Sequence, residues 1–166
     1  PPDAVIPYPA VTSQLDFEGE LAVVIGRRGR HIPPQEAYDY VFGYTIVNDL
    51  TARDLQQRHQ QWFRGKSLDG TCPMGPVIVS KDELGEARDL TLETRVNGER
   101  RQWARTDQMI FDIPTLIAVL SDGMTLEPGD IIATGTPAGV GAADGRFLQP
   151  GDRVEISISG IGTLAV

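Results

Sequence analysis

Short apolar runs alternate with turn-forming residues along the chain, a pattern typical of a protein built mostly from short strands. The clearest run, residues 17–26, is rich in β-branched side chains and predicts a strand. A second run, residues 41–49, predicts another strand, and each of the two runs has carboxylates at one end. Shorter runs predict further strands at residues 77–79, 90–96, 99–103, 131–134 and 154–158.

Turn signals separate several of these runs. Asn97-Gly98 lies between the runs 90–96 and 99–103 and predicts a hairpin with a type I′ turn. Pro128-Gly129 and Pro150-Gly151 each precede a run and predict type II turns. Most of the predicted strands should therefore pair with close neighbours in the sequence.

Three segments predict helices. A short helix should begin near Pro34, because a proline at the first helical position loses no hydrogen bond. Thr51 followed by Asp54 resembles a capping box and predicts a second helix from Thr51. Asp112 followed by Pro114 predicts a third helix, which should run through residue 120.

Strands and helices do not alternate regularly, so the pattern favours a mainly β domain with a few helices (α+β) over a doubly wound sheet. We expect a roll-like or barrel-like arrangement. Residues 1–15 contain four prolines and predict an extended lead-in. Residues 16–166 should then form a single domain, which the acidic residues described below mark as metal-binding and catalytic.

Composition excludes several classes of partner. The chain has 166 residues, a net charge of -8 and a pI near 4.7, and its basic residues form no large cluster. Binding to nucleic acid or to an anionic membrane surface would need such a cluster, so we expect neither partner. No apolar run approaches the roughly 20 residues of a membrane-spanning helix.

The cysteine content bears on the cellular compartment of the protein, and the first residue bears on whether a segment precedes it. Cys72 is the only cysteine, which rules out a disulfide framework and fits a reducing compartment, so we expect a cytoplasmic protein. The chain begins with Pro1 instead of methionine. We therefore expect a further segment before Pro1.

Three carboxylates form the main candidate site. Glu18 and Glu20 are two residues apart on a predicted strand and thus point the same way, and Asp49 ends the next long strand. If the two strands pair, the three side chains converge as oxygen ligands suited to Mg²⁺, Mn²⁺ or Ca²⁺. The simpler alternatives are a solvated strand face for the two glutamates and a helix cap for Asp49.

Two loops supply further candidates. Lys66 lies in an irregular segment, residues 63–76, which could fold over the carboxylates and present an ammonium to an acidic substrate. Gly135 and Thr136 belong to a glycine-rich segment whose backbone N–H and hydroxyl groups could bind an anion. A solvated lysine and a plain turn are the alternatives. The spacing fits no nucleotide-binding motif.

In combination, four segments of the chain resemble the fumarylacetoacetate hydrolase superfamily. They read D-F-E-G-E-L-A-V-V-I-G, Y-T-I-V-N-D-L-T-A-R-D-L-Q, G-K-S-L-D-G-T-C-P-M-G-P and L-E-P-G-D-I-I-A-T-G-T-P-A-G-V-G, in that order. The resemblance covers nearly all of residues 16–166. It implies the mixed β-roll fold of that family and a homodimer.

The resemblance also implies roles for single residues. Glu18, Glu20 and Asp49 match the family's ligands for Mg²⁺, with Mn²⁺ or Ca²⁺ as alternatives. The matches to substrate-binding and catalytic groups are Gln56, Lys66, Gly135 and Thr136, of which Lys66 and Thr136 are the catalytic candidates. Arg53 matches an arginine that we expect to be mainly structural.

The implied function is metal-dependent chemistry on a small 2-oxo or 1,3-diketo acid through an enolate, with C–C bond hydrolysis of an acylpyruvate as the main expectation. There are two alternatives. One is isomerisation of 2-hydroxymuconate-like diacids, including the 2-hydroxyhepta-2,4-diene-1,7-dioate type met in aromatic catabolism. The other is decarboxylation of oxaloacetate. Hydrolytic members of the family carry a His and Glu dyad on a lid, and this chain has no H-x-x-E. A non-catalytic β-rich binding domain remains the rival from another class.

Overall fold

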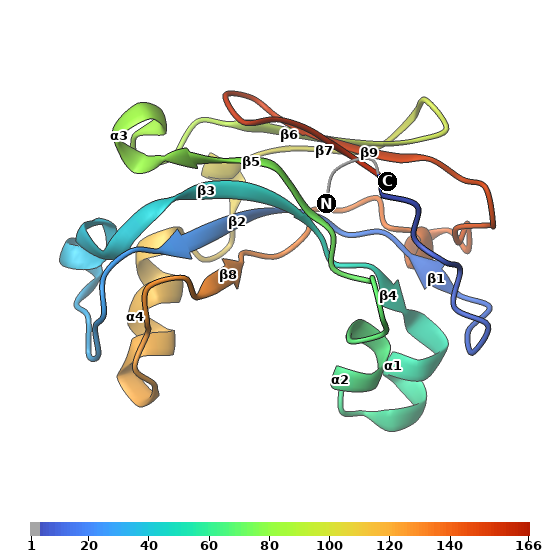
Figure 1. The fold of residues 1–166 in the computed structure, drawn as a ribbon, viewed down its shortest axis with the longest axis horizontal. Coiled ribbons are helices and arrows are strands. Elements are labelled where there is room, and N and C mark those ends of the chain that lie inside the picture. Colours follow the sequence, from blue (N-terminus) through green and yellow to red (C-terminus); the bar gives the residue numbers. More distant parts are fainter. Residues whose placement is uncertain (1–3) are drawn as a thin grey trace.

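The computed structural model describes residues 4–166 as a mainly β fold (Figure 1). Its strands are β1 (Leu15–Asp16), β2 (Gly19–Ile25), β3 (Val41–Asn48), β4 (Thr51–Ala52), β5 (Met74–Ser80), β6 (Thr91–Val96), β7 (Glu99–Arg105), β8 (Ile131–Ala133), β9 (Val154–Ile158) and β10 (Gly162–Ala165). Its α-helices are α1 (Arg53–His59), α2 (Phe63–Lys66), α3 (Lys81–Leu84) and α4 (Ile113–Gly123), and its 3-10 helices are η1 (Pro34–Tyr40), η2 (Thr106–Gln108) and η3 (Gly141–Ala143).

The strands form two four-stranded antiparallel sheets and one small pair. The first sheet has the order β5-β3-β2-β8, the second has the order β10-β9-β6-β7, and β1 pairs with β4. The second sheet lies across one face of the first (Figure 1). The expected mainly β fold with a few helices is confirmed, but the sheets do not close into a barrel.

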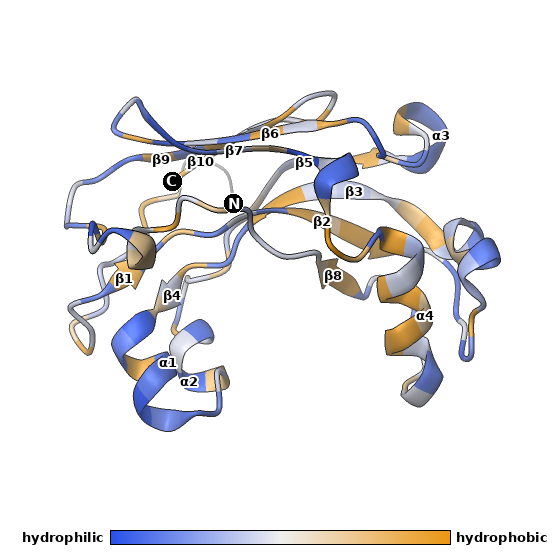
Figure 2. Cartoon of the chain, turned by 180° about the vertical axis from the view of Figure 1, so that it is seen from behind, coloured by the Kyte–Doolittle hydropathy of each residue, from blue (hydrophilic) through white to orange (hydrophobic). Residues whose placement is uncertain are grey.

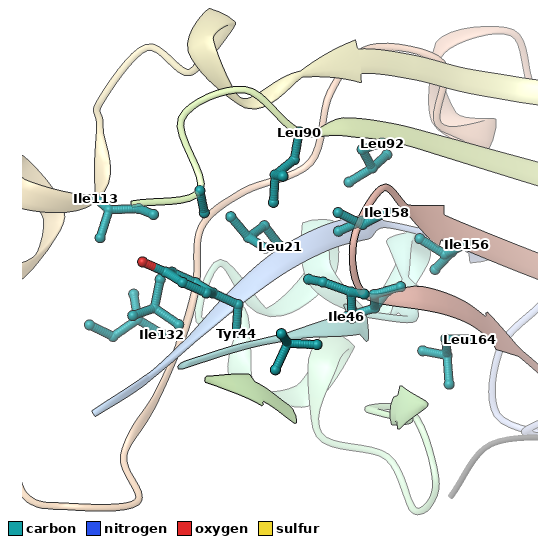
Figure 3. Packing of buried hydrophobic residues seen from close by; sticks show 14 of the residues in the cluster. Leu21, Tyr44, Ile46, Leu90, Leu92, Ile113, Ile132, Ile156, Ile158 and Leu164 are labelled. Atoms are coloured by element: carbon teal, nitrogen blue, oxygen red, sulfur yellow. The ribbon is translucent and has the colours of Figure 1, made fainter. Parts of the chain in front are cut away.

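The core fills the space between the two sheets. Register pairs Leu21 of β2 with Ile46 of β3, so both side chains leave the first sheet on the same face. They pack there against Ile156 and Ile158 of β9, and all four are at most 2 % exposed (Figure 3). Because every residue of β2 is buried, its sequence is almost continuously apolar after Glu20 instead of alternating.

Helix α4 and the pair α1 and α2 stand at opposite ends of the first sheet, on the side away from the second sheet (Figure 1). Helix α4 presents an apolar side toward the protein, while α1 is mostly hydrophilic (Figure 2). Ile113 and Ile117 of α4 are buried in the core. The pair α1 and α2 follows β3 and β4, and it is this end of the sheet that carries the acidic residues.

Several sequence predictions are confirmed in detail. Asn97 and Gly98 both have positive φ, 51° and 81°, as a type I′ turn between β6 and β7 requires. Asp112 caps α4, because its side chain accepts a hydrogen bond from Thr115 N at 2.9 Å. The short helix predicted at Pro34 is the 3-10 helix η1.

The helix start predicted at Thr51 is wrong. Thr51 lies in β4 opposite Asp16, and α1 begins at Arg53 without a side-chain cap. The Thr51 hydroxyl donates instead to Asp49 O at 2.9 Å, and Asp54 accepts a hydrogen bond from the Thr12 hydroxyl. The Thr51 hydroxyl thus binds the backbone before it, and Asp54 binds a residue far away in the sequence, so neither group forms the predicted cap.

Other element boundaries also differ from prediction. The segment 63–76 is not a continuous loop, since it contains α2 and the start of β5. Strand β10 was not predicted, because Gly160 and Gly162 break its apolar pattern. Of the expected lead-in, residues 4–14 contain no helix or strand, and residues 1–3 lie outside the described part of the chain.

Candidate metal and substrate site

Glu18, Glu20 and Asp49 converge as predicted from the strand pattern. Strands β2 and β3 pair antiparallel with Glu20 opposite Val47, and Asp49 N donates to Glu18 O at 3.0 Å just beyond the ladder. One carboxylate oxygen of each residue lies within 4.8 Å of the others. Glu18 and Glu20 are 7 % and 3 % exposed and the Asp49 side chain is 21 % exposed, so the three acids share a largely buried space.

Lys66 reaches into the same space from the end of α2. Its Nζ lies 2.8 Å from Glu18 Oε2 and 2.5 Å from Asp49 Oδ2, and it donates to the Thr51 hydroxyl at 3.0 Å. Burial is the largest single influence on the Lys66 pKa and lowers it, but the bonds to Asp49 and Glu18 together raise the pKa above its usual value. Lys66 is therefore an ammonium at neutral pH, and a base only at high pH.

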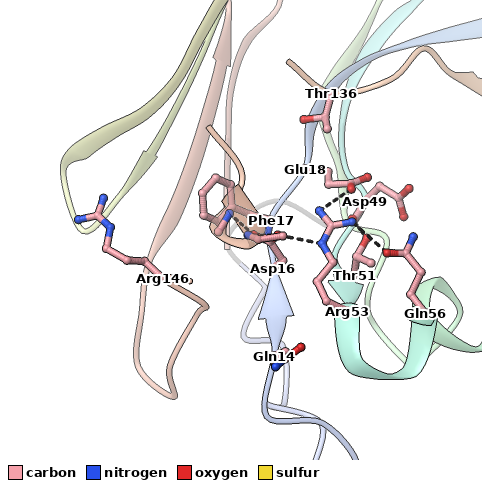
Figure 4. Close-up of polar contacts among 12 residues, drawn as sticks. Gln14, Asp16, Phe17, Glu18, Asp49, Thr51, Arg53, Gln56, Thr136 and Arg146 are labelled. Atoms are coloured by element: carbon pink, nitrogen blue, oxygen red, sulfur yellow. Dashed lines mark hydrogen bonds and ion pairs between the residues drawn. The ribbon is translucent and has the colours of Figure 1, made fainter. Parts of the chain in front are cut away.

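Arg53 holds Glu18 from the other side (Figure 4). Its Nη2 lies 2.7 Å from Glu18 Oε1, and its Nε donates to Asp16 Oδ2 at 2.9 Å. Asp16 is completely buried and also accepts backbone N–H bonds from Gly141 and Ala142. The expected structural role of Arg53 thus consists of a direct contact with a candidate metal ligand.

Gln56 lies beside Arg53 on the next turn of α1. Its Oε1 accepts from Arg53 Nη1 at 3.2 Å. A Cβ built on Gly65 would lie 2.8 Å from the Cβ of Gln56, so a larger residue at position 65 would push α2 away from α1. Close packing of the two short helices therefore sets the position of Lys66 relative to Gln56.

The loop after β8 closes the opposite side of the acidic space. Gly135 N donates to Glu20 Oε2 at 2.7 Å, and the Thr136 hydroxyl donates to Gly19 O at 3.0 Å. Both donors proposed for an anion are thus used within the protein. A substrate oxygen would have to compete with Glu20 for the Gly135 N–H, and the role of these two residues in substrate binding stays a prediction.

The acid cluster changes the titration of Glu20. Burial raises the pKa of Glu20 to about 7, helped by the charges of Glu18 and Asp49 and opposed by the hydrogen bond from Gly135 and by Lys66. Without a cation, Glu20 therefore keeps its proton to near neutrality. A divalent cation would favour its ionised form.

This shift predicts how stability changes with pH in the metal-free protein. The unfolded chain loses the Glu20 proton near pH 4.5, whereas the folded state keeps it to about pH 7. The free energy of unfolding should therefore fall as pH rises between these values, by up to about 3 kcal/mol. Urea denaturation with EDTA at several pH values measures it. Glu20→Gln should lack this component, and an identical pH slope in both proteins would contradict it.

The geometry fits a hard divalent cation. Neighbouring oxygens on octahedral Mg²⁺ or Mn²⁺ are about 3.0 Å apart and opposite ones about 4.2 Å, so carboxylate oxygens within 4.8 Å of one another need to close by at most about 2 Å. The donor set contains only oxygen, as such ions prefer. Among residues 4–166, no other group of three acidic, histidine or cysteine side chains is brought together in this way.

Sequence reasoning missed two buried polar residues that support the site, Asp16 and Gln102, and one contact of Arg53. Asp16 and Gln102 are 0 % and 1 % exposed, and Arg53 was assigned no contact with Glu18. Asp16 precedes the strand and could have been noted as a charge within a buried run. Gln102 lies in a hairpin strand among charged residues, and no local signal distinguishes it.

The fold and the acidic site together define a family. A family profile described as the C-terminal region of fumarylacetoacetate (FAA) hydrolase matches residues 1–166. The chain belongs to the fumarylacetoacetate hydrolase family and has the fold of an enzyme of that family. Among residues 4–166, no helix combines the length and apolar character needed to cross a bilayer.

Individual relatives narrow the comparison. The chain is 62 % identical over 165 residues to oxaloacetate tautomerase YisK of Bacillus subtilis, covering 98 % of this chain and 55 % of the relative. It is 48 % identical to the crystal structure of 2-hydroxyhepta-2,4-diene-1,7-dioate isomerase from Mycobacterium marinum, with a TM-score of 0.91, covering 99 % of this chain and 62 % of the other.

A third relative was crystallised with a metal. The chain is 36 % identical, with a TM-score of 0.89, to fumarylpyruvate hydrolase from Pseudomonas aeruginosa in complex with Mn²⁺ and pyruvate, covering 96 % of this chain and 67 % of that one. The chain spans about half the length of the curated relatives it matches. Hydrolase, isomerase and tautomerase thus all occur among its relatives.

Proposed function

We propose that this protein is a divalent-metal-dependent enzyme that interconverts the keto and enol forms of a small 2-oxo diacid such as oxaloacetate. The observation that carries the proposal is the convergence of Glu18, Glu20 and Asp49 beside the Lys66 ammonium. The identity of 62 % with an oxaloacetate tautomerase supports this choice of reaction. Mg²⁺ is the proposed cofactor, with Mn²⁺ or Ca²⁺ as alternatives.

The three carboxylates would hold the cation, which supplies Lewis-acid stabilisation of an enolate when bound. Lys66 keeps its positive charge at neutral pH and would stabilise the negative charge that develops on the substrate oxygen. Arg53 fixes Glu18 so that this ligand does not turn away. Gln56, Gly135 and Thr136 would contact the remaining polar groups of the substrate.

C–C bond hydrolysis of an acylpyruvate, the main expectation from the sequence, is the second candidate. The crystallised fumarylpyruvate hydrolase with Mn²⁺ and pyruvate favours it. Hydrolysis starts from the same bound 2-oxo acid but also needs an activated water. Decarboxylation of oxaloacetate is a third outcome of the same enolate.

A substrate panel distinguishes these reactions. Oxaloacetate, an acylpyruvate and a 2-hydroxydienoate diacid are each followed by ultraviolet absorbance, with pyruvate formation measured separately. We expect faster exchange between the keto and enol forms of oxaloacetate, loss of this activity with EDTA and recovery with Mn²⁺. Cleavage of the acylpyruvate instead would select hydrolysis. No turnover of any of these acids, or activity insensitive to EDTA, would contradict the proposal.

We also propose that the protein forms a homodimer, as the family resemblance implies. Strand β5 is an edge strand of its sheet and exposes Val77 and Ile78, which are 53 % and 51 % exposed. An apolar sheet edge of this kind is normally covered. Light scattering coupled to size exclusion measures the mass, and a monomer at micromolar concentration would refute the dimer.

A further inference from the structure

Gln102 belongs to the second sheet, yet its side chain reaches the strand that carries the acidic ligands. It lies on β7 and is 1 % exposed. Its Oε1 accepts the N–H of Gly19, the residue between Glu18 and Glu20, at 3.1 Å. Its Nε2 donates to the Thr136 hydroxyl and to Pro137 O, both at 2.8 Å. One buried amide thus uses both of its N–H groups and its oxygen.

These bonds join the two flanks of Glu20. On one side Gln102 binds the backbone at Gly19, and on the other side it holds the loop in which Gly135 N donates to Glu20 Oε2. The Thr136 hydroxyl completes the connection by donating back to Gly19 O. A carboxylate can rotate around its side-chain bonds, so the Gly135 N–H selects one orientation only while the loop keeps its place.

Gly19 is the residue that permits this approach. A Cβ at position 19 would collide with the Thr94 hydroxyl and lie 3.2 Å from Gln102 Oε1. The glycine between the two glutamates thus provides space for the second sheet.

We propose that Gln102 is a positioning residue for the divalent-cation site: it fixes the orientation of Glu20 by locking the Thr136 loop to β2. This inference rests on the proposed function, because it requires that Glu20 bind a cation. Gln102 itself contacts neither the cation nor the substrate. Its loss should therefore weaken metal binding without removing a ligand, by about tenfold, as for other residues that orient ligands from behind.

Isothermal titration of metal-free protein with Mn²⁺ tests this directly. Gln102→Met keeps the size of the side chain and removes its hydrogen bonds. We expect a Kd for Mn²⁺ about tenfold higher, with a stoichiometry still near one in the folded fraction. Activity at saturating Mn²⁺ should recover to within a few-fold of wild type. A merely structural role would instead reduce the number of sites at an unchanged Kd.

Two further variants complete the experiment. Thr136→Val removes the hydroxyl that accepts from Gln102 Nε2 and donates to Gly19 O. Because Thr136 is only half-buried, this variant remains informative if Gln102→Met does not fold. It should weaken Mn²⁺ binding by a similar factor. Combining both changes should weaken it little further, since they break one connection. Thr94→Val is the matched control, because Thr94 is as deeply buried as Gln102 and its hydroxyl makes no hydrogen bond within the described residues.

The outcomes separate the two proposals. An unchanged Kd in Gln102→Met, or in Thr136→Val if the first variant is unfolded, would overturn the positioning role and leave the metal site intact. Additive effects of the two changes would also overturn it, as would an equal loss in Thr94→Val. If the wild-type protein takes up no Mn²⁺, the proposed function fails and this inference falls with it.

Discussion

Glutamine in place of Glu20 should cost the protein most of its affinity for Mn²⁺ or Mg²⁺, on the order of a hundredfold or more, while the fold persists. Glu20 is the suitable residue because its side chain makes no ion pair and its only hydrogen bond within the described residues comes from Gly135 N. With a pKa raised to about 7, it is already partly protonated in the metal-free protein. The amide should therefore be tolerated, and turnover of a 2-oxo acid should be lost with the metal.

Calorimetric titration with Mn²⁺ and the oxaloacetate assay measure both effects. Glu93→Gln is a matched control, since Glu93 also lies on a strand, is 26 % exposed and belongs to the other sheet. It should bind Mn²⁺ like wild type. Undiminished Mn²⁺ binding by Glu20→Gln would show that Glu20 is no ligand.

The second large effect is expected for Lys66→Met, which should reduce kcat roughly 10²–10³-fold without weakening metal binding. The Lys66 ammonium lies between Glu18 and Asp49, where it competes with the cation for the two carboxylates. Its removal takes away this competition and also the charge that would stabilise the enolate. In the metal-free protein Asp49 would lose its ion pair, and Glu18 would keep only its ion pair with Arg53. The free energy of unfolding should then fall by about 2 kcal/mol, allowing for partial exposure of these groups.

Steady-state kinetics at saturating Mn²⁺ and urea denaturation with EDTA measure these two effects. Lys81→Met is the natural control, because Lys81 is the only other lysine in the chain and donates to Tyr38 O far from the acids. It should leave kcat unchanged. Wild-type kcat in Lys66→Met would remove Lys66 from the catalytic machinery.

The convergence of the three acids could be predicted because it depends on local rules. Strand alternation places Glu18 and Glu20 on one face, and pairing of two consecutive long strands brings Asp49 beside them. The hairpin at Asn97-Gly98 and the cap at Asp112 also follow from neighbouring residues. The alternation, the hairpin and the cap are each specified within a few positions of the sequence, and the approach of Asp49 follows from the pairing of consecutive strands.

The supporting contacts could not be predicted in this way, because they join residues far apart in the chain. Asp16 meets Gly141 and Ala142, and Gln102 meets Gly19 from the opposite sheet. No local pattern states how the two sheets stack, and stacking decides which buried polar side chains find partners. The mistaken helix start at Thr51 has the same origin, since pairing with Asp16 overrides the local capping signal.

Anomalous diffraction from crystals grown with Mn²⁺ would test the metal site most directly. One strong peak is expected among the carboxylate oxygens of Glu18, Glu20 and Asp49, at about 2.1–2.2 Å from each ligand atom, with Lys66 beside it. A peak at another place, or no peak here at a Mn²⁺ concentration that supports activity, would contradict a cation held by these three acids.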